Sequence, residues 1–277
     1  TVGIARSAAD RDRRIRLLVN ESNVGMVGNW NRCLVESRGE FIKYLFSDDL
    51  LASPDTLRRM VDVLEHDASI ALVASARTII DEQSVVRGSR SFDRSDRVFP
   101  GGAVIKRCFE EQRNLVGEPS VVLFRKEAAK RGFDPRYRQL VDLEMWFHLL
   151  EQGAFTFLAE PLCSFRVHEN QETERNNRRL NHIHDFLLLY EEYLSRTAPA
   201  GLSALHRRYL IDAQLHQLWK RSRRDPVLRD EARLTISRYY PPWEFLLHRA
   251  LYKLINPLYK IKRLVSRNLW RRAEYVS

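Results

Sequence analysis

The sequence predicts an α/β fold, a mostly parallel β-sheet flanked by helices, followed by an α-helical C-terminal region. Short apolar runs alternate with amphipathic helical patterns at about 30 residues per unit, which is typical of a parallel sheet built from strand–helix–strand units. From about residue 176 onward, apolar residues recur only at helical spacing. We therefore predict an α/β domain at residues 1–175 and a basic helical region at residues 176–277.

The first part of the α/β domain is predicted to alternate strands and helices. Gly39 follows a helical pattern and suits the left-handed backbone that often ends helices. Ser53 suits an N-cap, and Pro54 suits the first helical position. The predicted strands are Ile15–Val19, Phe41–Phe46 and Ile70–Ser75, and the predicted helices are Asn29–Ser37 and Pro54–Glu65.

The rest of the chain is predicted from the same patterns. Residues 81–116 are polar and irregular, which predicts a long surface excursion. The α/β domain then continues with strands at Ser120–Phe124 and Phe155–Leu158, a short helix at Lys126–Arg131 and a helix at Leu143–Gln152. The expected C-terminal helices are Ile183–Leu194, Leu202–Arg221, Asp230–Tyr239 and two further stretches separated by Asn256-Pro257.

Composition and charge narrow the class of protein. With 44% hydrophobic residues the chain can bury a core, which excludes a largely disordered or low-complexity protein. The excess positive charge lies in the C-terminal region, which holds 20 Lys/Arg and 9 Asp/Glu. Residues 1–175 hold 26 Lys/Arg and 27 Asp/Glu, so they are nearly neutral. This asymmetry disfavours a uniformly basic nucleic-acid-binding domain and favours a basic appendage.

The cysteines and the apolar runs indicate a cellular compartment. Cys33, Cys108 and Cys163 are far apart and form no CxxC, which argues against a disulfide framework or a zinc site. No apolar run approaches the ~20 residues of a transmembrane helix, and no signal peptide opens the chain. We therefore expect a cytoplasmic protein with free thiols.

The strongest candidate site is the pair Asp48-Asp49, which follows the second predicted strand. Open α/β sheets place their ligands at the carboxyl ends of strands. Two adjacent carboxylates are costly to bury unless a cation neutralises them, and a divalent metal bridging to a phosphate would do so. The alternative is a solvated loop whose aspartates only cap the following helix.

Two further stretches carry candidate residues. Asp142 lies at the start of a helix, where it could accept a proton from a hydroxyl nucleophile, or could be a plain N-cap. Arg166 and His168 follow the last predicted strand and alternate onto one side, where they could meet a phosphate and a metal. The alternative for His168 is an ordinary surface histidine. Dinucleotide-binding GxGxxG, P-loop, GxSxG and HExxH motifs are absent from the sequence.

Several stretches, taken together, resemble the family 2 glycosyltransferases of the GT-A fold, a Rossmann-related architecture. Their order and spacing carry the resemblance, which covers about residues 12–170. The stretches are Ile15–Gly25 with Asn29 and Asn31, Arg38–Ile42, Leu45–Leu51, Arg131–Asp134 with Val141–Trp146, and Gly153–His168.

The resemblance implies roles for the candidate residues. The family's acidic motif, here Asp48 and Asp49, binds the diphosphate of a nucleotide sugar through Mg²⁺ or Mn²⁺. It implies that Asp49 and His168 hold this metal, that Asp48, Asp49 and Arg166 contact the nucleotide sugar, and that Asp142 is the catalytic base. The implied reaction is sugar transfer to a hydroxyl of a saccharide or lipid-linked acceptor, with inversion, in cell-surface polysaccharide or glycolipid synthesis.

The sequence departs from the family pattern at three places. Phe46 occupies the first acidic position of the usual DxD motif, and Val141 stands where an acidic residue is common. The family also begins with a strand, a helix and a second strand, ahead of the stretch that matches Ile15–Gly25. This chain has no counterpart of these elements before Ile15, and it starts at Thr1 rather than Met. We read the chain as lacking this first βαβ portion, and expect it alone to bind nucleotide poorly, to be inactive and to expose a sheet edge.

The basic C-terminal region has its own prediction. After Pro257, apolar residues recur on one helical face, and residues 238–277 hold nine basic and two acidic residues. This pattern favours helices that lie on an anionic membrane surface, which would place the protein peripherally on the inner face of the cell membrane. The alternative is that these helices pack on the catalytic domain.

Two other classes of function stay open. A nucleic-acid-binding protein could use the basic tail, with affinity that falls steeply with salt. That reading leaves Asp48-Asp49 unexplained, so we expect no nucleic-acid partner. A sugar nucleotidyltransferase would also place acidic residues on a metal, but it leaves Asp142 without a role.

Overall fold

A computed structural model describes the chain apart from residues 1, 169–175, 177–178, 197–201, 224 and 273–277, and apart from the side chains of residues 195–196 and 265–272. The helices are α1 (Val2–Arg11), α2 (Gly25–Glu36), α3 (Thr56–His66), α4 (Gly101–Glu111), α5 (Val141–Leu150), α7 (Asn181–Arg196), α8 (Ala204–Ser222), α9 (Pro226–Ser237) and α10 (Pro242–Arg272). Two short 3₁₀ helices are η1 (Pro119–Val121) and η2 (Glu127–Ala129).

The strands form one sheet in the order β1-β6-β3-β7-β2, with β4 added to β3 and β5 added to β7. They are β1 (Phe41–Lys43), β2 (Leu50–Leu51), β3 (Ile70–Ile80), β4 (Val86–Arg90), β5 (Arg97–Phe99), β6 (Val122–Arg125) and β7 (Ala154–Arg166). The α/β class and the helical C-terminal region predicted from the sequence are confirmed.

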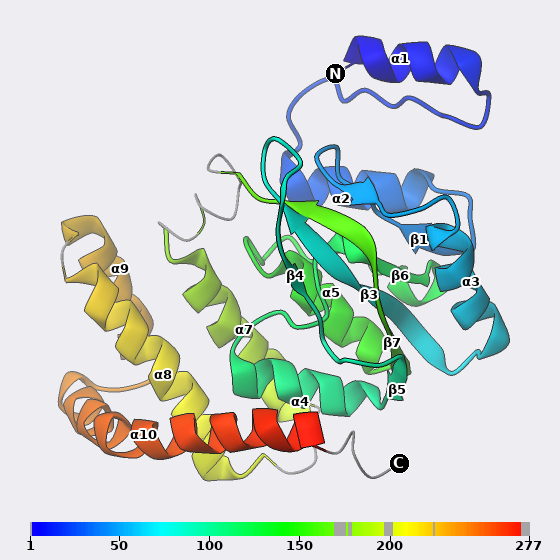
Figure 1. Cartoon of the computed structure of the whole chain (residues 1–277). Coiled ribbons are helices and arrows are strands. Elements are labelled where there is room, and N and C mark those ends of the chain that lie inside the picture. The colour runs from blue at the N-terminus through cyan, green and yellow to red at the C-terminus, as the bar shows by residue number, and fades with distance from the viewer. Residues whose placement is uncertain (1, 169–175, 177–178, 197–201, 224, 273–277) are drawn as a thin grey trace.

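The prediction of a mostly parallel sheet is wrong. Among the described strand pairs only β3 and β7 are parallel, and the other pairs are antiparallel. The reason is that β6 inserts between β1 and β3 and runs opposite to both. Strands β1, β3 and β7 therefore still share one direction, so their carboxyl ends lie at one edge of the sheet (Figure 1). That edge carries the candidate site.

Helices cover both faces of the sheet. On one face, Met60 and Leu64 of α3 pack in a cluster with Val73 of β3. On the other face, the larger core cluster includes Leu72 of β3 and Trp146 of α5. Because successive residues of a strand point to opposite faces, Leu72 and Val73 enter different clusters and β3 is buried on both sides.

Helix α7 shares the larger core with the sheet. Phe109 of α4 lies 5.2 Å from Tyr190 of α7, and Phe147 of α5 lies 5.4 Å from Tyr193, measured between ring centroids. The hydrophobic core therefore continues across residue 176, and the division into two domains there stays a prediction.

Three sequence predictions near the N-terminus and in the middle of the chain need correction. Ile15–Val19 forms no strand: it pairs with no described strand, and Ile15, Leu18 and Val19 are exposed. Residues 81–116 are not irregular, since they form β4, β5 and α4 and bury Phe92 and Phe99 against β7. Helix α3 begins at Thr56, after Asp55, rather than at Pro54 with Ser53 as its cap.

Strand β1 lies at one end of the strand order and pairs only with β6 among the described strands. The two predicted C-terminal stretches are one helix, α10, with Pro257 inside it. No helix among the described residues combines the length and apolarity needed to cross a membrane.

Candidate functional site

The loop after β1 places Asp48 and Asp49 at the shared carboxyl edge of the sheet. Asp49 is 5% exposed, whereas the side chain of Asp48 is 38% exposed. The backbone amide of Arg166, the last residue of β7, donates to Asp49 Oδ1 at 3.0 Å. Burial raises the pKa of Asp49 above its ordinary value, and the Ser120 hydroxyl and the Arg166 amide oppose this shift.

Arg166 and His168 lie in the same place as the two aspartates. Arg166 Nε donates to the carbonyl of Asp48 at 2.9 Å, and its Nη1 donates to the carbonyl of Asp81 at 2.5 Å and to Ser84 Oγ at 3.0 Å. His168 Nε2 lies 3.4 Å from Asp48 Oδ2. The structure thus brings together the four residues that the sequence predicted as nucleotide-sugar or metal ligands.

The donor atoms at this edge suit a divalent cation. Asp49 Oδ2 is buried and forms no hydrogen bond with the described residues. A buried carboxylate oxygen without a partner is costly unless a cation or donor approaches it. Asp48 Oδ2 supplies a further carboxylate oxygen, the ligand type that suits Mg²⁺ and Mn²⁺, and His168 Nε2 lies beside it. The residues present therefore fit the metal that the sequence predicted.

Lys43 is a further charged group beside Asp49 that the sequence interpretation missed. Its ammonium donates to the carbonyl of Ser120 and lies 3.7 Å from Cys163 Sγ. Burial lowers the pKa of Lys43 to about 8, and the charge of Asp49 opposes this shift. A lysine inside the short apolar strand β1 is the signal in the sequence that could have identified it.

Asp142 lies in the first turn of α5, and its carboxylate has two hydrogen-bond donors. Leu143 N donates to Oδ1 at 2.7 Å, and Asn114 Nδ2 donates to Oδ2 at 2.9 Å. The N-cap position is occupied by Leu140, so Asp142 is not the N-cap. Burial raises the pKa of Asp142 to about 7, more than these hydrogen bonds lower it. A carboxylate with such a pKa is poised to accept a proton near neutral pH.

A tight turn holds Asn114 against Asp142. Asn114 Oδ1 accepts from Gly117 N at 3.0 Å, and the Gly117 carbonyl accepts from Asn114 Nδ2 at 3.0 Å and from Trp146 Nε1 at 2.9 Å. Gly117 has φ +124°, and a Cβ there would lie 2.5 Å from Val121 Cγ2. Only glycine fits this position without rearrangement.

Glu118 connects the two candidate centres, and the sequence interpretation missed it as well. Its negative charge raises the pKa of both Asp49 and Asp142. Arg77 of β3 holds Glu118, with Arg77 Nε 2.6 Å from Glu118 Oε2. Glu118 lies in a turn with no periodic pattern, so nothing in the sequence singles it out. Glu118 therefore acts electrostatically on both carboxylates.

A second group of acids lies away from this site, at Asp134, Glu144 and Glu192, whose carboxylate oxygens lie within 4.8 Å of one another. Arg131 Nη2 lies 2.6 Å from Glu144, and Arg136 lies 2.5 Å from Asp134 and 2.6 Å from Glu192. Each acid thus has an arginine partner, and the group is an ion-pair network that joins α5 to α7.

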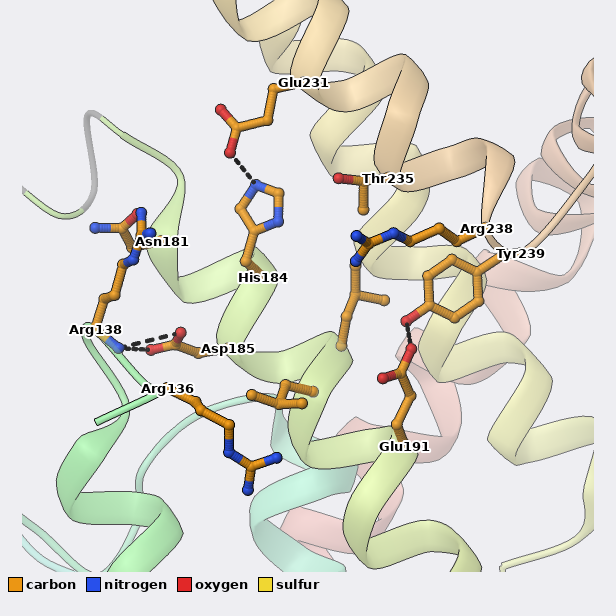
Figure 2. A pocket seen from close by; sticks show the side chains of 12 residues that line it. Arg136, Arg138, Asn181, His184, Asp185, Glu191, Glu231, Thr235, Arg238 and Tyr239 are labelled. Atoms are coloured by element: carbon orange, nitrogen blue, oxygen red, sulfur yellow. Dashed lines mark hydrogen bonds and ion pairs between the residues drawn. The ribbon is translucent and has the colours of Figure 1, made fainter. Parts of the chain in front are cut away.

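A polar pocket of about 260 Å³ lies between α7, α9 and the segment around Arg138. Figure 2 shows the side chains that line it. Its acids have partners. Asp185 accepts from the backbone amides of residues 138, 139 and 140, Glu231 lies 3.5 Å from His184, and Glu191 accepts from the Tyr239 hydroxyl. None of the site residues predicted from the sequence lines this pocket.

Part of the chain matches a known protein family. Residues 1–133 match the family described as Glycosyl transferase family 2. An uncharacterised protein of Mycobacterium tuberculosis is 29% identical over 171 residues, which is 58% of this chain and 52% of that protein. An uncharacterised glycosyltransferase of Methanocaldococcus jannaschii is 26% identical over 165 residues, which is 59% of this chain and 54% of that protein. These matches thus span about half the length of each relative.

Among solved structures, a mannosyltransferase of Pyrobaculum calidifontis, in complex with GDP-Man and Mn²⁺, superposes with a TM-score of 0.48 and 15% sequence identity. The superposition covers 95% of this chain and 73% of that chain.

Proposed function

We propose that the protein transfers a sugar from a nucleotide-diphosphate sugar to an acceptor hydroxyl, because residues 1–133 match the family described as Glycosyl transferase family 2. The observation that carries the proposal is that the structure holds two acidic groups with different properties. Asp49 is buried with an unpartnered oxygen, and Asp142 has a pKa of about 7. Sugar transfer needs both a diphosphate-binding group and a base.

Asp142 is assigned the role of general base. It accepts the proton of the acceptor hydroxyl as that oxygen attacks the anomeric carbon of the donor sugar. A new glycosidic bond forms while the bond from the anomeric carbon to the diphosphate oxygen breaks. The nucleoside diphosphate leaves with the bonding electrons. A single displacement of this kind inverts the anomeric configuration.

Asp48, Asp49 and His168 are assigned to the diphosphate side. These residues would hold Mg²⁺ or Mn²⁺, which when bound stabilises the negative charge on the diphosphate leaving group. Asp49 is fixed by the Arg166 amide, so its free oxygen keeps its position. The more exposed Asp48 is available to the nucleotide.

Arg166 is assigned two contributions. The hydrogen bonds that its guanidinium donates to backbone carbonyls fix the loop that carries Asp48 and Asp49. Its positive charge favours a diphosphate at the same edge of the sheet. We assign the acceptor to the saccharides or lipid-linked saccharides of cell-surface polysaccharide or glycolipid synthesis.

The test is a panel of nucleotide-diphosphate sugars with Mn²⁺, using the full-length gene product and measuring release of nucleoside diphosphate. We expect at least one donor to be consumed, and Asp142→Asn to lower turnover by about 10²-fold or more. Asp230→Asn, an exposed change on α9, is the matched control and should keep wild-type turnover. Turnover of no donor, or full turnover by Asp142→Asn, would overturn the assignment.

A further inference from the structure

Helix α10 presents two different sides, and its inner side fixes how it lies. Tyr259 stacks on Tyr209 of α8 with ring centroids 3.8 Å apart and an interplanar angle of 7°. The Tyr209 hydroxyl donates to Asn256 Oδ1 at 2.9 Å, and the guanidinium of Arg249 lies 3.2 Å from the ring centroid of Trp219. These contacts determine which side of α10 faces α8 and which faces outward.

The outward side of α10 is apolar. Its large hydrophobic residues recur every three or four positions, so they share one face of the helix. Trp243 is 70% exposed and Leu254 is 74% exposed. We call this surface the outer face of α10; its exposed members are Trp243, Leu246, Leu247, Leu251, Leu254, Leu258, Ile261 and Leu264. Single exposed leucines are ordinary, but a continuous apolar stripe marks an interaction surface.

Positive charge flanks the outer face. At 100° per residue, Lys253 and Lys260 lie on one side of the stripe and Lys262 lies on the other. All three are exposed, and Lys253 and Lys260 form no ion pair with the described residues. Glu244 is the one acidic residue in α10, which also holds eight Lys/Arg. The partner of this surface is therefore apolar in part and negatively charged in part.

We propose that the outer face of α10 docks on an anionic lipid bilayer, with the helix axis in the plane of the interface. The leucines and Ile261 enter the acyl boundary, Trp243 lies at the level of the headgroups, and the lysines contact anionic headgroups. A second copy of the chain fits less well, because pairing two such faces brings lysines against lysines. This proposal does not depend on sugar transfer.

The test is sedimentation of the full chain with vesicles of phosphatidylcholine mixed with phosphatidylglycerol, without nucleotide sugar. We expect the wild-type chain to bind these vesicles. The double substitution Leu254→Gln with Leu258→Gln should weaken binding by about tenfold or more, because two apolar side chains that would leave water on binding are lost. The matched control is Val227→Gln with Leu234→Gln on α9, two residues about as exposed as Leu254 and Leu258, and it should bind like wild type.

Charge and depth give two further readouts. Lys253→Gln and Lys260→Gln should each weaken binding to anionic vesicles by about fivefold, and should matter little on pure phosphatidylcholine. Brominated lipid should quench the tryptophan fluorescence of the wild-type chain, and this quenching should be lost in Trp243→Phe. Each of three results would overturn the proposal: no binding to anionic vesicles, equal weakening by the α9 control, or a dimer or nucleic-acid complex that binds no vesicles.

Discussion

The backbone amide of Arg166 donates to Asp49 Oδ1 at 3.0 Å, although the two residues lie 117 positions apart in the sequence. This hydrogen bond joins the end of β7 to the loop after β1. It exists because β1 and β7 run in the same direction, which brings their carboxyl ends to one edge of the sheet. The edge thus assembles acidic and basic groups from distant parts of the chain.

The first prediction concerns pH. If Asp142 is the base, only its ionised form is active, and its pKa of about 7 places the acidic limb of kcat/KM near neutrality. We expect kcat/KM to fall about tenfold per pH unit below about 7 and to level off above it. The measurement is kcat/KM for donor consumption between about pH 5 and 9. A profile that stays flat down to about pH 5 would show that an ordinary carboxylate, or no carboxylate, acts as the base.

The second prediction is that two substitutions near Asp142 shift the acidic limb of kcat/KM in opposite directions. Asn114→Ala removes a hydrogen bond that lowers the pKa of Asp142, so the limb should move to higher pH. Glu118→Gln removes a negative charge that raises the same pKa, so the limb should move to lower pH. Shifts of about half a unit or more are expected.

The two variants control for each other, because general damage to the site would not move the limb both ways. Far-ultraviolet circular dichroism should confirm that both variants fold, since Glu118 also pairs with Arg77. Shifts of the same sign would contradict the assignment of Asp142.

The third prediction concerns the loop that carries the two aspartates. Arg166→Ala removes the bonds to the carbonyls of Asp48 and Asp81 and to the Ser84 hydroxyl. We expect the free energy of unfolding to fall by about 1–3 kcal/mol, because partly buried carbonyls lose charged donors. Ser84→Ala removes only one of these contacts and should cost less than about 1 kcal/mol. Urea unfolding of both variants checks this, and equal losses would contradict it.

The fourth prediction concerns Asp185 of α7, which is 3% exposed. Its Oδ2 accepts from the amides of Arg138, Gln139 and Leu140 at 3.1, 2.6 and 2.8 Å. Asp185→Ala leaves these amides without their acceptor, so we expect the free energy of unfolding to fall by about 2 kcal/mol or more. Asp185→Asn keeps one acceptor and should lie between the alanine variant and wild type. An alanine variant as stable as wild type would show that water satisfies these amides.

Much of the site was predictable because it depends on strand ends. Asp48 and Asp49 follow an apolar run, and Arg166 and His168 follow another, so the rule that ligands gather at carboxyl ends of strands predicts their meeting. The structure brings them together, although their roles remain predictions. Glu118 and Asn114 could not be predicted in this way, because they lie in a turn whose place is set by the strand that follows it, β6.

The errors in the fold have local causes. The apolar run at Ser120–Phe124 predicts a strand but contains nothing that specifies its direction or its neighbours, so it does not predict the insertion of β6 between β1 and β3. Pro257 predicts a break because proline removes a helical hydrogen bond. The contacts of Asn256 and Tyr259 with Tyr209 hold the helix through that position instead.

The central claim is that Asp49 and Asp142 serve one reaction in different ways. The most direct measurement compares donor affinity and turnover in Asp49→Asn and Asp142→Asn, with Mn²⁺ and the donor identified for the full-length protein. We predict that Asp49→Asn loses Mn²⁺-dependent donor binding, whereas Asp142→Asn binds the donor like wild type and loses transfer by about 10²-fold or more. Unchanged Mn²⁺-dependent binding in Asp49→Asn, together with wild-type transfer by Asp142→Asn, would contradict the account.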